Sequence, residues 1–477
     1  MKRSRKTKIL YGLGFSSMGI KDALFQLFLF FYFSQILGLS GTYTGLATII
    51  ALFFDAISDP WVGNLSDRWK SKKYGRRHPF MYAAALPLGL SLYLLFSPPK
   101  GLVEFELFLW LCFFSALVRV ALTFFLVPGM SLGAELSEDY DERTSITSYR
   151  VMFSSMVGPI LLMFGLLVVF TPTEENANGL FNEAAYSRFA LLCGILAALA
   201  ILISTRGTQE TIHTLTQPSK NKLEEEKVST WRNLSEAIRL KSYTSLVGYI
   251  MIVYIGLGIG MVFTTYFTTY FFELSEKQLA GLPISSALGG ICALFLAPAM
   301  GKRFDKKKSV VVSTIGFGFL FASPYLLRFL NSFPPNHSPF LLPVYFLTLF
   351  GAYTFLWVAI SISNSMMAEV VDEFQSFYKK RNEGFFFSTM SFAYKCTVGF
   401  GYFFAGILLD FIAFPKQATQ VDQIPVEAIN GLGIIGGPLI LAIYFSSLLL
   451  IYPYPIDKKG YLIIKKKIHK GINNSIN

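Results

Sequence analysis

Two aspartates, Asp55 and Asp59, lie one helical turn apart within an apolar segment (ATIIALFFDAISDPWVG) that is long enough to cross a bilayer. Residues four positions apart share one face of a helix, so the two carboxylates project into the same space. An ionisable side chain at membrane depth costs about 2.5 to 3.5 kcal/mol and therefore normally faces an aqueous cavity or a bound ion. The pair predicts a site for Na⁺ or H⁺ within a membrane transporter. The alternative is that Asp59, beside Pro60, caps a helix break while Asp55 pairs with a structural arginine.

The composition places the rest of the chain in the membrane as well. Of the 477 residues, 53% are hydrophobic and 15% charged, which excludes an ordinary soluble enzyme. Segments of alternating polarity, as in a membrane barrel, do not occur, so we expect an all-α membrane protein with twelve transmembrane helices. The predicted spans lie near residues 10–37, 41–64, 79–97, 104–134, 147–170, 187–205, 244–273, 280–300, 309–330, 339–366, 384–413 and 431–452.

The longest hydrophilic stretch, residues 206–243, divides these spans six and six. A similar turn follows the second span of each half, from Gly63 to Arg68 and from Gly301 to Lys306. This duplication is typical of major facilitator transporters, whose two pseudo-symmetric six-helix bundles hold the substrate at midplane. We therefore expect bundles at 1–205 and 244–452, a cytoplasmic central loop at 206–243 and a basic cytoplasmic tail at 453–477.

The net charge of +12 follows the same pattern. Most Lys and Arg residues lie at the two termini and in the even-numbered loops, against only Lys100, Lys277 and Lys416 in the odd-numbered loops. The positive-inside rule then predicts that both termini are cytoplasmic, in a plasma membrane of the bacterial inner-membrane type. Anionic lipid headgroups on that side account for the charge, so no nucleic-acid partner is expected.

Cysteine and histidine add no further chemistry. All four cysteines fall inside predicted spans, which implies no disulfide framework, and the four histidines lack metal-ligand spacing. A polytopic membrane enzyme would need a nucleophile or a metal cluster, and no such constellation is apparent, so we expect no enzyme activity. We expect a protein that acts as a monomer in the lipid bilayer, with a small-molecule solute and a coupling cation as partners and no other cofactor.

Four segments carry a family resemblance: YGLG (Tyr11 to Gly14), FDAISDPWVG (Phe54 to Gly63), the run from Val127 to Arg150, and the run from Ala368 to Lys395. Together they resemble the glycoside-pentoside-hexuronide:cation symporters, the melibiose-permease branch of the major facilitators. The animal lysolipid symporters look like a distant branch of the same group.

The resemblance implies a cation site at Asp55, Asp59 and Thr123, with Ser58 nearby and Lys395 facing it from span eleven. The physics of burial gives the same grouping, because a buried ammonium needs a carboxylate partner and the two aspartates are the obvious acidic cluster at that depth. Cation binding would then compete with Lys395, so that occupancy changes the cost of closing the two halves.

Span four departs from the family pattern. The family's cation- and sugar-binding aspartate falls on Leu126, and its sugar-stacking tryptophan on Met130. The first-helix aspartate of the family aligns with Gly19, and the nearest carboxylate is Asp22, three residues on. Asp22 and Met130 are therefore candidate substrate contacts, but binding of melibiose-type galactosides is not expected.

Arg119 lies on the same stripe of span four as Thr123. Its guanidinium matches carboxylate or phosphate, which predicts a clamp for an anionic substrate. The alternative is a structural pair with Asp22, Glu135 or Asp410. Two further substrate-binding candidates, for hydrogen bonding and stacking respectively, are Arg150, matched by a family arginine, and Trp357 on span ten.

Charged residues at the cytoplasmic turns are candidates for gate pairs that join the two halves when that side is shut; the alternative is a set of solvated charges. They are Asp67, Arg68, Asp139, Glu142, Arg143, Glu369, Asp372, Glu373, Arg381 and Glu383. The function expected overall is cation-coupled symport of a glycoside, pentoside or hexuronide by alternating access. The alternative is a lysolipid or lipid transporter of the same fold.

Overall fold

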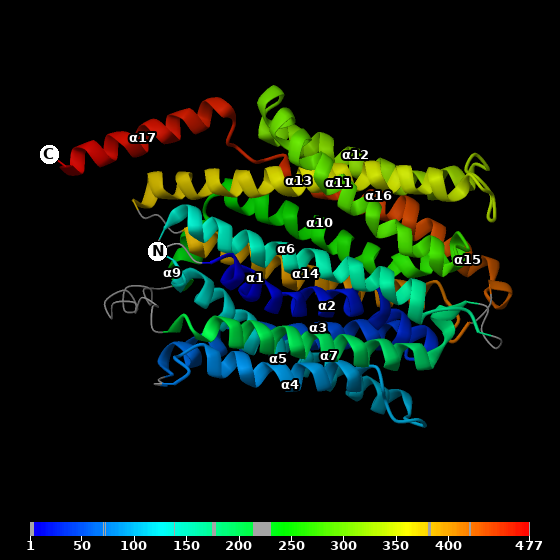
Figure 1. The fold of residues 1–477 in the computed structure, drawn as a ribbon. Coiled ribbons are helices and arrows are strands. Elements are labelled where there is room, and N and C mark those ends of the chain that lie inside the picture. The colour runs from blue at the N-terminus through cyan, green and yellow to red at the C-terminus, as the bar shows by residue number, and fades with distance from the viewer. Residues whose placement is uncertain are drawn as a thin grey trace.

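Long apolar helices make up most of the computed structural model and run side by side, with both termini at one end of the molecule (Figure 1). We call this end the terminal end and the opposite one the far end. The structure describes residues 4–69, 71, 73–137, 139–173, 178–212, 230–379, 383–418 and 421–476. Among them, eleven helices are long and apolar enough to cross a membrane.

The first predicted span is the one absent from those eleven, because its helix is segmented. A turn at Phe15 separates the first two helical pieces, and two π-helical pieces follow, so no single helix there reaches spanning length. The pieces are α1 (Arg5–Gly14), α2 (Ser16–Ala23), η1 (Leu24–Leu29) and η2 (Tyr32–Ile36). They follow one another from residue 5 to residue 36, and with the eleven long helices they account for the twelve predicted spans.

The remaining helices of the N-terminal half correspond to predicted spans two to six. They are α3 (Gly41–Arg68), α4 (His78–Leu95), α5 (Glu104–Glu135), α6 (Tyr140–Phe164) continued by η3 (Gly165–Val169), the short η4 (Gly179–Phe181) and α7 (Glu183–Gln209).

The C-terminal half contains the other six spans and two helices at its margins. They are α9 (Thr230–Ile238), α10 (Lys241–Tyr266) with η6 (Phe267–Phe271), α11 (Glu276–Arg303), α12 (Lys306–Phe329), α13 (Leu341–Tyr378), α14 (Glu383–Phe411), η7 (Val421–Gln423), α15 (Val426–Ile434) with η8 (Ile435–Leu439), α16 (Ile440–Ile451) and α17 (Lys458–Ile476).

Several helices extend beyond the apolar windows of the sequence. Helix α13 continues to Tyr378, twelve residues past the predicted end of span ten at residue 366. Polar side chains do not prevent this, since Glu and Gln have good helix propensity. The expected central loop is partly helical as well, because α7 ends at Gln209 and α9 precedes α10; residues 213–229 of that loop lie outside the described ranges.

Polar residues cap the starts of three of the long helices. The Ser40 hydroxyl accepts a hydrogen bond from the amide of Tyr43 at the start of α3. Ser275 and Gln278 form a capping box at the start of α11. The Asp139 carboxylate accepts from the amide of Glu142 at the start of α6. Each satisfies a backbone donor that the first helical turn leaves unpaired.

Helices α3 and α14 form the closest seam between the two halves. A Cβ atom added at Gly406 would lie 2.1 Å from the carbonyl oxygen of Gly41, and one added at Gly45 would lie 2.7 Å from the Cα of Phe403. Small residues at these crossings let the two backbones approach, which is how helices associate where lipid supplies no hydrophobic drive. Side chains of α3 and α14 therefore lie next to each other along this seam.

At the far end the two halves are joined by polar contacts. Asp410, near the end of α14, accepts hydrogen bonds from the amides of Gly41 at 3.0 Å and Thr42 at 2.7 Å. The Lys416 ammonium lies 2.8 Å from Glu104. Since Asp410 also lies at the positive end of the α3 dipole, this contact stabilises the closed arrangement of the far end.

Candidate cation site and substrate cavity

Helix α3 carries the two aspartates without interruption. It runs unbroken from Gly41 to Arg68 through Pro60, so Asp59 does not cap a helix break. Proline removes one backbone donor inside the helix, a local defect that membrane helices tolerate when neighbouring groups compensate. The regular helix keeps Asp55 and Asp59 on one face, and that face is turned toward α5 and α14, as the contacts below show.

Lys395 of α14 bridges the two carboxylates. Its ammonium lies 2.8 Å from Oδ2 of Asp59 and 3.1 Å from Oδ2 of Asp55. The Asp55 side chain is 13% exposed, whereas those of Asp59 and Lys395 are 35% and 41% exposed. The Asp59 end of the bridge is therefore open to water or an ion, and the Asp55 end is enclosed.

The other oxygen of each carboxylate faces α5. The hydroxyl of Thr123 lies 2.9 Å from Oδ1 of Asp59 and 3.3 Å from Oδ1 of Asp55, and the Ser58 hydroxyl lies 3.3 Å from that of Thr123. Two carboxylate oxygens and the Ser58 hydroxyl thus surround the Thr123 hydroxyl, and none of these oxygens is the one that Lys395 binds. Oxygen ligands of this kind suit a hard cation. The structure brings together all five residues predicted for the cation site.

Arg119, on α5, lies beside this group. One guanidinium nitrogen lies 3.9 Å from Oδ2 of Asp55, beyond hydrogen-bond range, and the group lies 5.4 Å from the centre of the Phe25 ring. Its Nε is buried and has no hydrogen-bond partner among the described residues. Arg119 also interacts electrostatically with Asp22.

Of the three carboxylates expected as structural partners of Arg119, two were predicted wrongly, those of Glu135 and Asp410, because each binds other groups. Glu135 binds Arg76 and Arg77 at 2.9 and 3.1 Å, and Asp410 binds the start of α3. Glu135 lies about 24 Å from Arg119 along α5 at 1.5 Å per residue, which by itself separates the two side chains. The nearest carboxylate is that of Asp55, and Asp22 is the one expected partner that remains within electrostatic reach.

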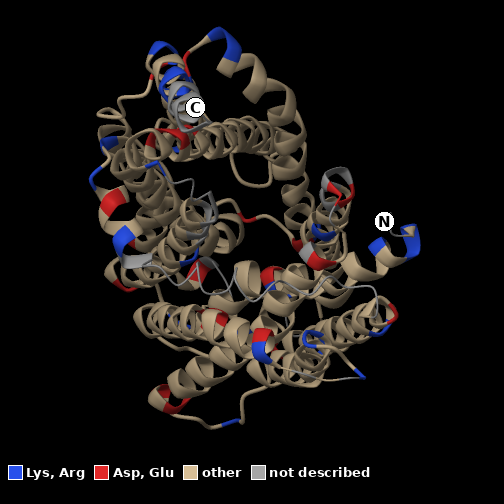
Figure 2. Ribbon diagram, turned by 90° about the vertical axis from the view of Figure 1, so that its left-hand side faces the viewer, with Lys and Arg blue, Asp and Glu red and all other residues tan. Residues whose placement is uncertain are grey.

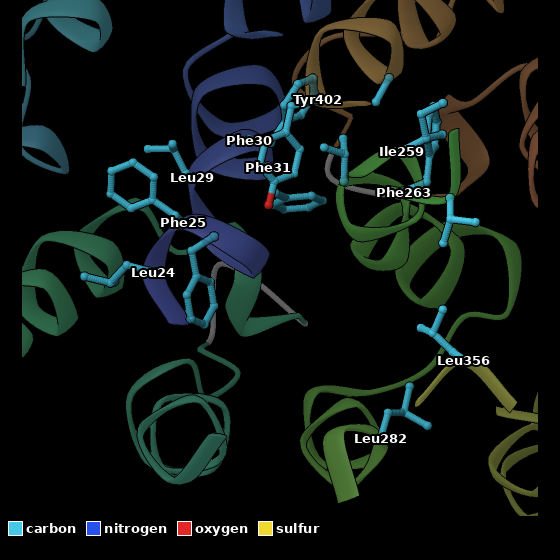
Figure 3. Packing of buried hydrophobic residues seen from close by; sticks show 14 of the residues in the cluster. Leu24, Phe25, Leu29, Phe30, Phe31, Ile259, Phe263, Leu282, Leu356 and Tyr402 are labelled. Atoms are coloured by element: carbon cyan, nitrogen blue, oxygen red, sulfur yellow. The ribbon is translucent and has the colours of Figure 1, made fainter. Parts of the chain in front are cut away.

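A cavity of about 980 Å³ opens between the two halves. The first helical segment and α6 line one side, and α10 to α14 together with α16 line the other. Its walls are mainly aliphatic and aromatic, with Leu282 of α11 and Leu356 of α13 on the C-terminal side (Figure 3). Among the described residues that line it, Asp22 is the one charged side chain.

The predicted substrate residues divide into two groups. Asp22 and Trp357 line the cavity, and the Trp357 indole donates to the Ser286 hydroxyl at 3.3 Å. Arg119, Met130 and Arg150 are not among the lining residues. The Arg150 guanidinium instead lies 5.7 Å from the centre of the Phe15 ring.

Sequence reasoning missed a pair of tyrosines in the cavity wall. Tyr254 of α10 and Tyr394 of α14 meet edge to face with centroids 4.6 Å apart, and both line the cavity. Tyr394 directly precedes Lys395, so the residue that follows a cavity-facing ring binds the two aspartates. The sequence did contain a signal for Tyr394, because it is adjacent to Lys395, a residue already predicted to face the cation site.

The candidate gate residues lie at the terminal end, where Figure 2 shows acidic and basic residues on loops and helix ends. Several are bound within their own half: Lys8 pairs with Glu142 at 3.0 Å and Arg77 with Asp67 at 2.5 Å, and Lys306 pairs with Glu369 at 2.6 Å.

The other candidates have local environments too. Tyr461 donates to Asp372, Ser242 donates to Glu373, and Arg68 is exposed. Arg381 and the side chains of Arg143 and Glu383 lie outside the described part of the chain. Because contacts between the halves are described at the far end and these pairs lie within each half, the arrangement has the far end closed.

Two helical halves around a central cavity, with paired carboxylates and a lysine at their seam, define a multi-pass secondary transporter of the major facilitator fold. The chain belongs to the family described as MFS/sugar transport protein, which matches residues 10–458. The family consists of transporters rather than enzymes.

Individual relatives agree with this assignment. The chain is 23% identical to the putative glycoside/cation symporter YagG of Escherichia coli, over 98% of this chain and 95% of the relative. It is 24% identical to the sodium-dependent lysophosphatidylcholine symporter 1 of Gallus gallus, over 95% and 87%. The crystal structure of the nucleoside transporter NupG superposes with a TM-score of 0.61 at 15% identity, covering 94% of this chain and all of that one, which supports the fold alone.

Proposed function

We propose that this chain is a symporter that couples Na⁺ or H⁺ to the movement of a glycoside, pentoside or hexuronide by alternating access. The observation that carries the proposal is the arrangement of Asp55, Asp59, Thr123 and Lys395 at the seam of the two halves. The Lys395 ammonium binds the Oδ2 atom of both carboxylates, while their Oδ1 atoms contact the Thr123 hydroxyl, beside that of Ser58. A coupling cation would bind there and weaken the hold of Lys395.

The solute would occupy the central cavity, with Asp22 accepting hydrogen bonds from hydroxyl groups and the Tyr254 and Tyr394 rings against the apolar face of a sugar. The lining supplies no lysine or arginine among the described residues. Among the three solute classes, this supports a neutral glycoside or pentoside better than a hexuronide, the anionic class that Arg119 suggested from the sequence.

The cavity also favours a second candidate, a lysolipid. Its volume of about 980 Å³ and its largely aliphatic wall could hold an acyl chain as well as a sugar. The relationship to a protein named as a lysophosphatidylcholine symporter points the same way. The two candidates share the cation site and differ only in what the cavity binds.

For the transport cycle, we propose that the terminal end is cytoplasmic and open in this structure, with the far end closed by Asp410 and Lys416. The protein would work as a monomer in a bacterial inner membrane, with the coupling ion as its only cofactor. Opening the far end then requires these contacts to separate while the charged residues of the terminal end pair across the halves.

Uptake into proteoliposomes tests the function. Purified protein is reconstituted and offered neutral glycosides, pentosides, uronides and lysolipids, each with an inward Na⁺ gradient, an inward proton gradient or neither. The proposal expects accumulation of one class that depends on one gradient. Accumulation of lysolipid alone would establish the second candidate, and equilibration of a solute regardless of either gradient would refute cation coupling.

A further inference from the structure

Charged side chains near the cavity and near the cation site contact the same buried ring, that of Phe25. Asp22 faces the cavity and pairs with its neighbour Lys21. The Lys21 ammonium lies 5.6 Å from the centre of the Phe25 ring, and the Arg119 guanidinium lies 5.4 Å from the centre of the same ring. The ammonium of Lys21 and the guanidinium of Arg119 therefore lie over the same buried ring.

On its other side Arg119 reaches the cation site. It lies 3.9 Å from the Asp55 oxygen that also receives Lys395 at 3.1 Å. Arg119 interacts electrostatically with both Asp55 and Asp22. Its guanidinium is held by neither carboxylate at hydrogen-bond distance, and its buried Nε has no partner among the described residues.

A guanidinium in this position can interact with either of two carboxylates, that of Asp55 or that of Asp22. Moving toward Asp55 would add a third hydrogen-bonding cation contact to the cation site and compete with an entering ion. Moving toward Asp22 would leave Asp55 to Lys395 and the ion. The buried surroundings raise the strength of each interaction, because the local dielectric constant is low.

We propose that Arg119 is a positioning residue that couples the two sites, moving between Asp55 of the cation site and Asp22 of the substrate cavity. A solute that binds the Asp22 carboxylate would change how strongly Arg119 is drawn toward Asp55. Cation affinity and solute affinity then depend on one another through this one side chain, as linkage requires. This inference rests on the proposed cation-coupled function.

The test uses the coupling ion alone, so that no solute need be known. Na⁺ binding to purified full-length protein is measured by titration calorimetry at alkaline pH, and proton uptake is measured in the absence of Na⁺. Asp22→Asn removes one of the two carboxylates between which Arg119 would move, so we expect cation affinity to fall about fivefold, within the usual range of coupling between sites.

The same Asp22 substitution is then made in proteins that carry Arg119→Gln or Arg119→Met. Two neutral replacements are used so that one remains if the other misfolds. The apolar methionine suits membrane depth better than the amide of glutamine. In either background we expect Asp22→Asn to change cation affinity less than about 1.5-fold, since the coupling energy has been removed. Arg119→Lys keeps the charge and should retain most of the fivefold effect.

Glu183→Gln, at an exposed carboxylate on α7, is the matched control and should leave cation affinity unchanged in every background. Equal effects of Asp22→Asn with and without Arg119, or no effect in the parent protein, would overturn the coupling role while leaving the cation site intact. A parent protein that binds neither Na⁺ nor H⁺ would instead overturn the proposed function itself.

Discussion

Asp410 and Thr42 face each other across the two halves, and the Asp410 carboxylate accepts from both the amide and the hydroxyl of Thr42, at 2.7 and 2.6 Å. The carboxylate caps the start of α3 from the opposite half of the molecule. Helix α3 carries Asp55 and Asp59 further along, and α14, which ends beside Asp410, carries Lys395. The contact that closes the far end and the candidate cation site thus lie on the same pair of helices.

Asp410→Ala should shift the protein toward a state open at the far end. The change removes a charged acceptor of two backbone donors and one hydroxyl, and hydrogen bonds to charged groups contribute about 1.5–3 kcal/mol each when fully formed, less at an exposed site. We expect the open population to rise roughly fivefold, corresponding to ~1 kcal/mol. Spin-label distances between positions 100 and 422, in a background without native cysteines, would show a longer component.

Glu427→Gln, at an exposed carboxylate of the same end, serves as the control and should leave the distance distribution unchanged. An Asp410→Ala protein with the parent's distances would mean that the Asp410 contact does not hold the far end closed.

Asp55→Asn and Asp59→Asn should each abolish accumulation of solute while leaving exchange across the membrane. The amide keeps the shape of the carboxylate but removes the charge that attracts the cation. Accumulation and exchange are measured in the same proteoliposomes, with Asp422→Asn as an exposed control on the far side. Parent-like accumulation by either variant would show that the coupling ion binds elsewhere.

Gly406→Ala should destabilise the seam between α3 and α14. Its new methyl group would lie 2.1 Å from the Gly41 carbonyl oxygen, so one backbone must move. Overpacking of this kind costs about 1–3 kcal/mol. Gly281→Ala is the matched control, because an added Cβ there meets nothing within 4 Å and alanine favours a helix. Thermal unfolding in detergent should therefore show a lower midpoint for the first variant only; equal midpoints would contradict the close approach.

The sequence predicted the helices and the aspartate pair because these depend on local periodicity and on the cost of burying charge. The prediction for Lys395 followed from the resemblance and from its need for a carboxylate. The segmentation of the first span was missed, since an apolar window contains no signal for a turn at Phe15 or for π-helical hydrogen bonding.

The environment of Arg119 could not be derived in the same way. Its contacts with Phe25 and Asp55 come from two other helices, and helix rotation decides them rather than spacing along α5. Spacing did exclude Glu135, which lies more than four helical turns away on the same helix. The apolar lining of the cavity is equally a tertiary property, because phenylalanine and leucine occur on every face of these helices.

Lys395→Ala should make the cation site bind its ion more tightly and reduce coupling. The ammonium bonds both carboxylates, at 2.8 and 3.1 Å, so its removal leaves the Oδ2 atom of each without its cationic partner. The pair is partly exposed, and such ion pairs contribute up to ~1 kcal/mol, which corresponds to roughly fivefold in affinity. Lys395→Arg keeps the charge and should resemble the parent.

Cation activation of uptake, measured over a range of Na⁺ concentrations and of pH, distinguishes these cases. The alanine variant should reach half-maximal activation at a lower cation concentration but with less accumulation of solute. An activation curve identical to that of the parent would show that Lys395 does not compete with the coupling ion, and its contact with Asp59 would then be a purely structural tie between α14 and α3.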